Sequence, residues 1–187
     1  MTRPLNLTYT LAAVALLVVV LMLGLGADRS EAAECKGGDK PAYAMEGKAA
    51  VKVTLCLLNK KRTSRGLGSL HPDSDQMQAA GEHNRLMVAS ACFSHMCSGE
   101  KDLLGRLIST GYLPCACTWL VAENIAWEPG KASSPREVVA AWMSSAGHRL
   151  NILNPQFDEV GIAVDQGSPV SKADRAATFT ADFAFKK

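Results

Sequence analysis

Charge clusters and long apolar runs are both scarce in this chain of 187 residues beyond residue 26. Lys and Arg number 20 against 18 Asp and Glu, which gives a formal net charge of +2, and this balance gives no indication of a nucleic-acid partner. Aromatic residues make up 6% of the chain, and there are four histidines. We therefore expect no nucleic-acid partner and few side chains that could carry chemistry.

Three signatures of enzymes and metal sites are also missing. The chain has no HExxH metalloprotease helix, no GxSxG nucleophile elbow and no CxxC pair. These absences disfavour a zinc peptidase of that type, an α/β-hydrolase and a cysteine–histidine zinc cluster. A serine hydrolase is a weaker alternative, in which Ser144 or Ser145 is the nucleophile, His148 the base and Glu123 the orienting acid.

The amino-terminal segment has the composition of an export signal. Arg3 precedes an uncharged stretch over residues 11–26, and small residues follow it before Cys35. We predict a signal peptide over 1–32, with an uncleaved membrane anchor as the alternative. The protein is therefore expected to be secreted or held at the cell envelope, and to contact a membrane only through this segment if it is uncleaved.

The six cysteines form an even set in a chain predicted to be exported. Such sets form disulfides in oxidising compartments. Their spacing does not select a pairing, although one residue separates Cys115 from Cys117 and a bridge between these two would be strained. The disulfide candidates are Cys35, Cys56, Cys92, Cys97, Cys115 and Cys117.

The rest of the chain is organised as a lead-in and one domain of the α+β class. Residues 33–46 are polar and contain Gly and Pro, and residues 47–187 form the domain. Apolar spacing predicts four helices, and alternation predicts an antiparallel strand pair near the C-terminus with a shorter strand before it. The expected helices are 47–61, one that follows the N-cap Asp73, about 101–110, and one that begins after Ser134 and ends at Gly147; the expected strands are about 120–126, 160–164 and 178–185.

Two histidines and one glutamate are the candidate site residues. His95 follows the second predicted helix, and His148 follows the fourth, so both imidazoles are expected on loops that open into a cleft. Glu123 lies among apolar residues on a predicted strand, and a buried carboxylate needs a cation, a metal or hydrogen-bond donors. The pair of histidines either ligates a divalent metal or only hydrogen-bonds Glu123.

The remaining histidines and the tryptophans are assigned no site role. His83 is expected to be structural or partly exposed on its helix, and His71 to lie in a loop. The tryptophans are expected mainly in the core. They are Trp119, Trp127 and Trp142.

An ordered set of short motifs resembles the CAP superfamily, in its bacterial secreted SCP-like branch. CAP denotes cysteine-rich secretory proteins, antigen 5 and pathogenesis-related proteins. The resemblance covers nearly everything from Val51 to the C-terminus. Its motifs are Leu58-Asn59, Gly66-Leu67, Phe93-Ser94-His95, Arg106, Gly111-Tyr112, Glu123-Asn124-Ile125-Ala126, Trp142-Met143, Gly147-His148-Arg149, Asn151-Ile152-Leu153 and Val160-Gly161.

The resemblance implies an α/β/α sandwich with a small antiparallel sheet between helical layers, stapled by disulfides. It also implies a groove formed by His95, Glu123, Ser145 and His148, in which His95 and His148, with or without Glu123, hold zinc or another divalent metal. Ser145 stands where animal members have a second glutamate. We favour a non-enzymatic binding module for a small-molecule, lipid or protein ligand. A metal-assisted peptidase or cell-wall hydrolase with Glu123 as base is the alternative.

Overall fold

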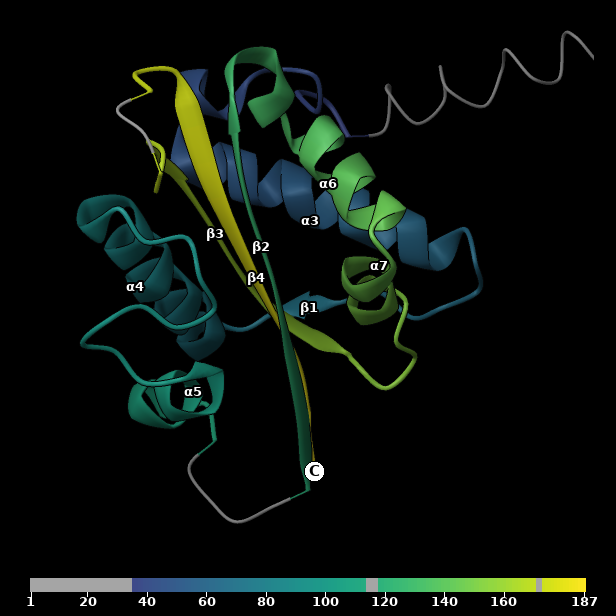
Figure 1. Ribbon diagram of the computed structural model, residues 1–187. Helices are drawn as coiled ribbons and strands as arrows, with labels where there is room; N and C mark the ends of the chain where they lie inside the picture. Colours follow the sequence, from purple (N-terminus) through teal and green to yellow (C-terminus); the bar gives the residue numbers. More distant parts are fainter. Residues whose placement is uncertain (1–34, 114–117, 171–172) are drawn as a thin grey trace, which may run out of the picture. The chain divides into compact units, whose positions relative to one another are not determined.

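A four-stranded sheet with helices on both faces forms the framework of the computed structural model (Figure 1). The structure describes residues 35–113, 118–170 and 173–187. Gly37–Lys187 is one compact unit, and Met1–Lys36 belongs to another. The predicted signal peptide lies outside the described residues. Within them, no helix is both long and apolar enough to span a bilayer.

The sheet has the order β1-β3-β4-β2. The predicted C-terminal pair is present as β3 (Glu159–Gln166) and β4 (Ala176–Lys186), which run antiparallel. The strand predicted as a short one is β2 (Trp119–Pro129), which has 11 residues and pairs with β4 along its whole length. His71 was expected in a loop, but it forms the two-residue strand β1 (His71–Pro72), parallel to β3.

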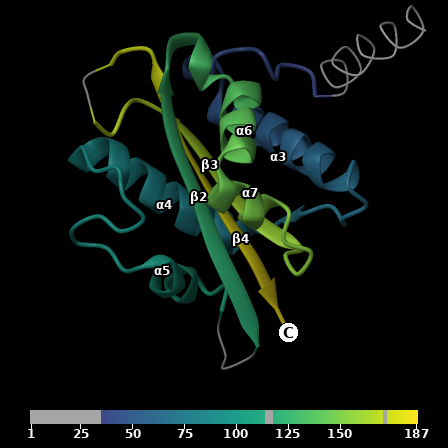
Figure 2. The same cartoon turned by 45° about the vertical axis from the view of Figure 1, so that its right-hand side comes forward.

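Two helical layers enclose this sheet, as Figures 1 and 2 show. One layer contains α4 (Ser74–Ser90) and α5 (Leu103–Thr110), and the other contains α3 (Gly47–Thr63), α6 (Pro135–Ser144) and α7 (Ala146–Ile152). Two short 3₁₀ turns, Ala42–Ala44 and Gly130–Ser133, complete the elements. The predicted α+β class and the α/β/α sandwich are confirmed.

The helix starts follow the predicted capping residues. The Asp73 carboxylate accepts hydrogen bonds from the amides of Asp75 and Gln76, 2.9 and 3.0 Å away, and Ser134 Oγ accepts one from the amide of Glu137. These contacts satisfy amides that the first turn of a helix leaves without partners. The four predicted helices therefore begin within two residues of their expected positions.

The prediction that Gly147 ends the fourth helix is wrong. Ser145 is extended, with φ −84° and ψ 126°, so it ends α6, and Gly147 lies in the first turn of α7. Arg149 Nη1 donates to the carbonyl of Met143, 2.9 Å away, across this break. His148 is therefore held on a helix and not on a loop.

A close contact between α4 and β3 fixes the helix on the sheet. A Cβ on Gly161 would lie 2.2 Å from the backbone carbon of Gln76. Only glycine permits this approach. On the other side of the sheet, Arg62 donates hydrogen bonds of 2.7–2.8 Å to four backbone carbonyls, those of Gly68, Ile152, Asn154 and Phe157. The loop between α7 and β3 is thereby tied to α3.

The prediction of disulfide staples is confirmed for part of the cysteine set. Cys92 and Cys97 are joined, and Cys35 and Cys56 each take part in a disulfide. Cys115 and Cys117 lie outside the described residues. The Cys92–Cys97 bridge closes a loop that contains His95, so it bears directly on the geometry of the candidate site.

Candidate functional site

His95 lies at the tip of the disulfide-closed loop that follows α4. Its side chain is 61% exposed, and its Nδ1 lies 2.7 Å from Glu123 Oε1. A histidine whose Nδ1 is held by a carboxylate has a fixed ring orientation and offers Nε2 to a ligand. The structure thus brings together two of the predicted site residues, one accessible and one buried.

Glu123 occupies the middle of β2, and its side chain is only 3% exposed. One oxygen bonds His95, and the other accepts a hydrogen bond from Arg106 Nη2. His83 Nε2 lies 3.7 Å from this second oxygen. Both oxygens are therefore engaged by protein groups, and the contact with Oε1 positions the His95 ring.

A second glutamate, which the sequence analysis did not single out, lies behind the first. Oε1 of Glu100 lies 2.9 Å from His83 Nδ1, within hydrogen-bond distance. The same oxygen accepts a hydrogen bond from the amide of Cys97, 2.6 Å away. Arg106 Nη1 lies 3.6 Å from Glu100 and donates to the His95 carbonyl, 3.0 Å away. His83 and Arg106 therefore join two acids and the loop that contains His95.

Asp182 completes this buried cluster from the neighbouring strand. It is directly opposite Glu123 in the β2–β4 register, and it is fully buried. Burial, followed by the charge of Glu123, raises the pKa of Asp182 well above its usual value. Neither carboxyl oxygen of Asp182 has a hydrogen-bond partner among the described residues, so burial without a partner favours its neutral, protonated form.

The pKa values of His95 and His148 are shifted in opposite directions. The hydrogen bond that His95 donates to Glu123 raises the pKa of His95, against the effect of partial burial. Partial burial and then the charge of His95 lower the pKa of His148. Burial alone would raise the pKa of Glu123, but the bond to His95 and the charges of Arg106 and His83 bring it below its ordinary value. Glu123 is consequently ionised and poorly suited to act as a general base near pH 7.

His148 contributes to an open groove of about 440 Å³ beside β2. Its ring centroid is 6.5 Å from that of Trp142, and its backbone carbonyl accepts a hydrogen bond from Asn124 at 3.1 Å. Predicted site residues Ser145 and His148 both line this groove. The full lining is Phe93, Ile125, Ala126, Trp127, Glu128, Ala141, Trp142, Ser145 and His148.

The serine-hydrolase alternative finds no support in the groove. Ser144 Oγ donates to the Ala140 carbonyl within its own helix, at 3.0 Å. No hydrogen bond joins Ser145 to His148 in the described part of the chain, and Glu123 bonds His95 instead of His148. The residue types of a triad are present, but they are not arranged as one.

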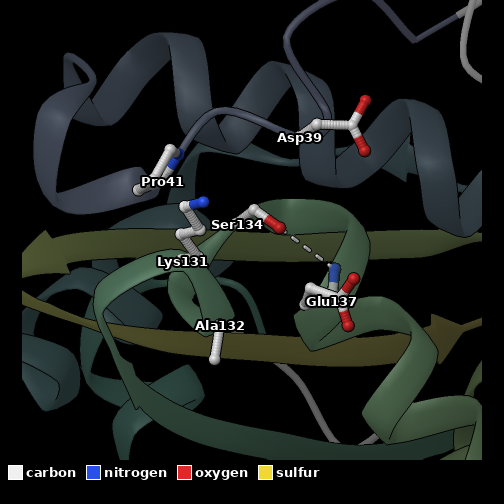
Figure 3. Close-up of a pocket in the computed structure, with 6 residues that line it drawn as sticks. All are labelled: Asp39, Pro41, Lys131, Ala132, Ser134 and Glu137. Atoms are coloured by element: carbon white, nitrogen blue, oxygen red, sulfur yellow. Dashed lines mark hydrogen bonds between the residues drawn. The ribbon is translucent and has the colours of Figure 1, made fainter.

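A second hollow lies at the start of α6, away from the histidines (Figure 3). Its volume is about 530 Å³, and Asp39, Lys131, Ser134 and Glu137 are among its lining residues. Ser134 is occupied in capping α6, and Asp39 pairs with Arg136 at 2.7 Å. These polar groups have structural partners, so we place the candidate site in the groove beside β2.

Comparison with known proteins identifies the family of this chain. The family model described as "CAP: Cysteine-rich secretory protein family" matches residues 55–183, a span that contains all four predicted groove residues. The chain belongs to the CAP family. The resemblance drawn from the sequence motifs, including the bacterial SCP-like branch, is thereby confirmed.

The matching CAP-family relatives are bacterial and longer than the segment they share with this chain. The uncharacterized protein YkwD of Bacillus subtilis is 34% identical over 60% of this chain and 41% of its own length. The uncharacterized membrane protein YlbC of the same organism is 31% identical over 62% of this chain and 31% of its length. The matched segment therefore spans less than half of either relative.

Solved CAP-type structures share the fold. An extracellular protein of Bacillus anthracis that contains an SCP domain has a TM-score of 0.59 and 26% identity, over 73% of this chain and 40% of that chain. An outer surface protein of Borrelia burgdorferi has a TM-score of 0.63 and 19% identity, over 76% and 97%. The second likeness bears on the fold alone.

The buried cluster around Glu123 is the part of the candidate site that sequence reasoning missed. His83 was expected to be structural or partly exposed, and its side chain is fully buried between Glu100 and Glu123. Asp182 sits on an alternating strand, and Glu100 in a polar loop, and neither pattern indicated a partner. Arg106 was noted only as a family motif, although a lone arginine on an apolar helix could have prompted a search for buried acids.

Proposed function

We propose that this CAP domain is an extracellular binding module whose groove holds a ligand without converting it chemically. The amino-terminal sequence is typical of export, and the Bacillus anthracis relative is described as extracellular. The observation that carries the proposal is the engagement of both Glu123 oxygens by His95 and Arg106. An ionised carboxylate held in this way cannot readily act as the proton acceptor that the hydrolase alternative requires.

His148 in the groove and His95 beside it are the donors for a modest divalent-metal site. His95 is not among the residues that line the groove, but its charge acts on His148. His95 offers Nε2 because Glu123 holds its Nδ1 at 2.7 Å, an arrangement typical of metal-binding histidines. The lowered pKa of His148 favours the neutral imidazole that ligates metals. No group of three or more His, Cys, Asp or Glu suited to a metal occurs among the described residues. Two imidazoles would therefore hold zinc with water or ligand atoms completing its coordination shell.

Zinc titration of the full chain by calorimetry tests the metal part of the proposal. We expect one zinc per chain, lost in the double variant His95→Ala/His148→Ala and retained in His71→Ala, whose histidine lies on β1 outside the groove. Equal binding by the wild type and the double variant would contradict a groove site.

Turnover assays test the absence of chemistry. The full chain with zinc is incubated with a fluorogenic peptide library and with purified cell-wall material. We expect no product above the level of a heat-inactivated sample. Product formation that disappears in Glu123→Gln would overturn the binding proposal and establish the hydrolase instead.

A further inference from the structure

The groove lies along an exposed margin of the sheet. In the order β1-β3-β4-β2, one margin is the two-residue β1 and the other is the 11-residue β2. Figure 2 shows β2 in front, between the layer of α4 and α5 and the layer of α6 and α7. An edge strand carries backbone N–H and C=O groups on its open side, which can pair with another chain.

The register shows which residues of β2 direct these groups outward. Thr118 and Lys187 exchange two backbone hydrogen bonds, of 3.2 and 2.8 Å, and Gly130 donates one to Arg175. Because antiparallel residues alternate between bonded and non-bonded pairs, the even-numbered residues of β2 bond to β4 and the odd-numbered ones face away. The carbonyls of Glu123 and Ile125 agree with this alternation, since they accept hydrogen bonds from the side chains of Asn151 and Trp142.

Part of this edge is already engaged by the protein itself. The carbonyls of Glu123 and Ile125 are covered by those two side chains, and the outward position at Pro129 has no N–H. Trp127 lies between these two limits and lines the groove. In the described part of the chain, no side chain or neighbouring backbone bonds the outward N–H or C=O of Trp127.

The walls of the groove suit side chains on either side of a strand. Phe93 is 42% exposed on one wall, and Trp142 and His148 form the other. Glu128 supplies a negative charge in the same groove. A lipid chain could fill the apolar part, but it would cover the Trp127 N–H and C=O without pairing them, and a buried unpaired backbone group is unfavourable.

We propose that the groove takes an extended peptide segment of a partner protein, which adds to β2 as a short strand and exchanges backbone hydrogen bonds with Trp127. This inference rests on the proposed binding function and names its ligand class. Strand addition of this kind derives affinity from the main chain and specificity from alternate side chains. The apolar walls favour an aromatic or aliphatic residue in the segment, and Glu128 favours a basic one.

Selection from a displayed library of random linear heptapeptides on the full chain provides the probe. A selected peptide is synthesised, and its dissociation constant is measured by fluorescence anisotropy. It is then remade with an N-methyl group at each residue in turn. We expect at least tenfold weaker binding at alternate residues and little change between them, because only every second amide of an added strand faces β2.

Two substitutions at one position isolate the backbone amide. Trp127→Ala keeps the N–H and removes the side chain, whereas Trp127→Pro removes both, at an edge position where proline is tolerated. We expect Trp127→Pro to bind the peptide at least tenfold more weakly than Trp127→Ala, with circular dichroism and melting curves verifying that both fold. If the proline variant does not fold, the N-methyl series alone decides.

Each other outcome has a definite meaning. Failure to select a peptide, no alternation in the N-methyl series, or equal binding by the alanine and folded proline variants would overturn the inference. A parallel titration with the apolar dye 1-anilinonaphthalene-8-sulfonate, compared with Phe93→Ser, tests the groove itself. Dye binding that depends on Phe93, without peptide binding, would contradict strand addition but would still support a binding function. Absence of dye binding and of peptide binding would contradict both strand addition and the proposed binding function.

Discussion

Glu123 and Asp182 face each other across the β2–β4 pair, and both carboxyl groups are buried. Two ionised carboxylates could not share this site, because they would repel each other where water is excluded. The pKa of Asp182 is raised well above its usual value by burial and by the charge of Glu123. Asp182 therefore holds its proton to higher pH than an ordinary carboxyl group does, whereas His95 and Arg106 keep the pKa of Glu123 below its ordinary value.

The raised pKa of Asp182 predicts a specific dependence of stability on pH. A carboxyl group whose folded pKa exceeds its unfolded value of about 3.9 binds more protons in the folded state. It contributes stability fully at low pH, and this contribution is lost as the pH rises toward the folded pKa. Asp182→Asn cannot ionise. In urea unfolding at pH 4 to 9, the free energy of unfolding of the wild type should fall relative to that of Asp182→Asn as the pH rises. A constant difference would contradict a protonated Asp182.

Removing Arg106 should destabilise the domain strongly. Its guanidinium bonds Glu123 and lies 3.6 Å from Glu100, and its side chain is only 6% exposed. Arg106→Met leaves two buried acids without this cation, which costs about 3–5 kcal/mol. Urea unfolding at pH 7 measures the loss. The control is Asp39→Asn, which breaks the partly exposed Asp39–Arg136 pair and should cost about 0–1 kcal/mol. Similar losses in the two variants would show that the buried cluster does not depend on Arg106.

The sequence predicted the framework of this domain because its determinants are local. Asp73 and Ser134 cap their helices through contacts within three residues, and the alternation of β3 and β4 reflects one strand geometry. The buried cluster is different. Asp182 meets Glu123 only through the register of β2 with β4, and no local pattern encodes which residues of distant strands are paired.

The histidines illustrate the same limit at the candidate site. His83 and His95 are close in sequence, but one lies on the buried face of α4 and the other in an exposed loop. Gly147 has the residue type of a helix end, yet the break falls at Ser145 because the chain turns there to bring α7 against β2. A motif located His95, Glu123 and His148, whereas the tertiary contacts decided the role of each.

Glu123 should control the charge of His95. The hydrogen bond that His95 donates to Glu123 is the main cause of the raised pKa of His95. Glu123→Gln should therefore lower that pKa, because the charge of Arg106 would then disfavour the charged ring without an opposing carboxylate. The pKa of His148 should rise slightly, because the charge of His95 helps to lower it. Imidazole NMR titrations in EDTA report both values. Ser145→Ala, a groove variant without this bond, should leave the pKa of His95 unchanged. An unaltered His95 pKa in Glu123→Gln would contradict the arrangement.

Two glycines of the family motifs should respond to alanine in opposite directions. At Gly161 the new Cβ would lie 2.2 Å from the backbone carbon and 2.3 Å from the backbone oxygen of Gln76. Backbone cannot move aside as a flexible side chain can, so α4 would have to shift from the sheet, at a cost of about 3 kcal/mol or more. At Gly147 a Cβ would meet nothing within 4 Å.

Gly147 also has an ordinary helical conformation in α7, without a positive φ. Gly147→Ala should therefore stabilise the domain by about 0.4–1 kcal/mol, because alanine restricts the unfolded chain more than glycine does. Thermal and urea unfolding of the two variants beside the wild type give both signs in one experiment. Because α4 also carries His83 into the buried cluster, Gly161→Ala should disturb the His95 imidazole resonances, and Gly147→Ala should leave them in place. Loss of stability in both variants would contradict the open space around a Cβ at Gly147.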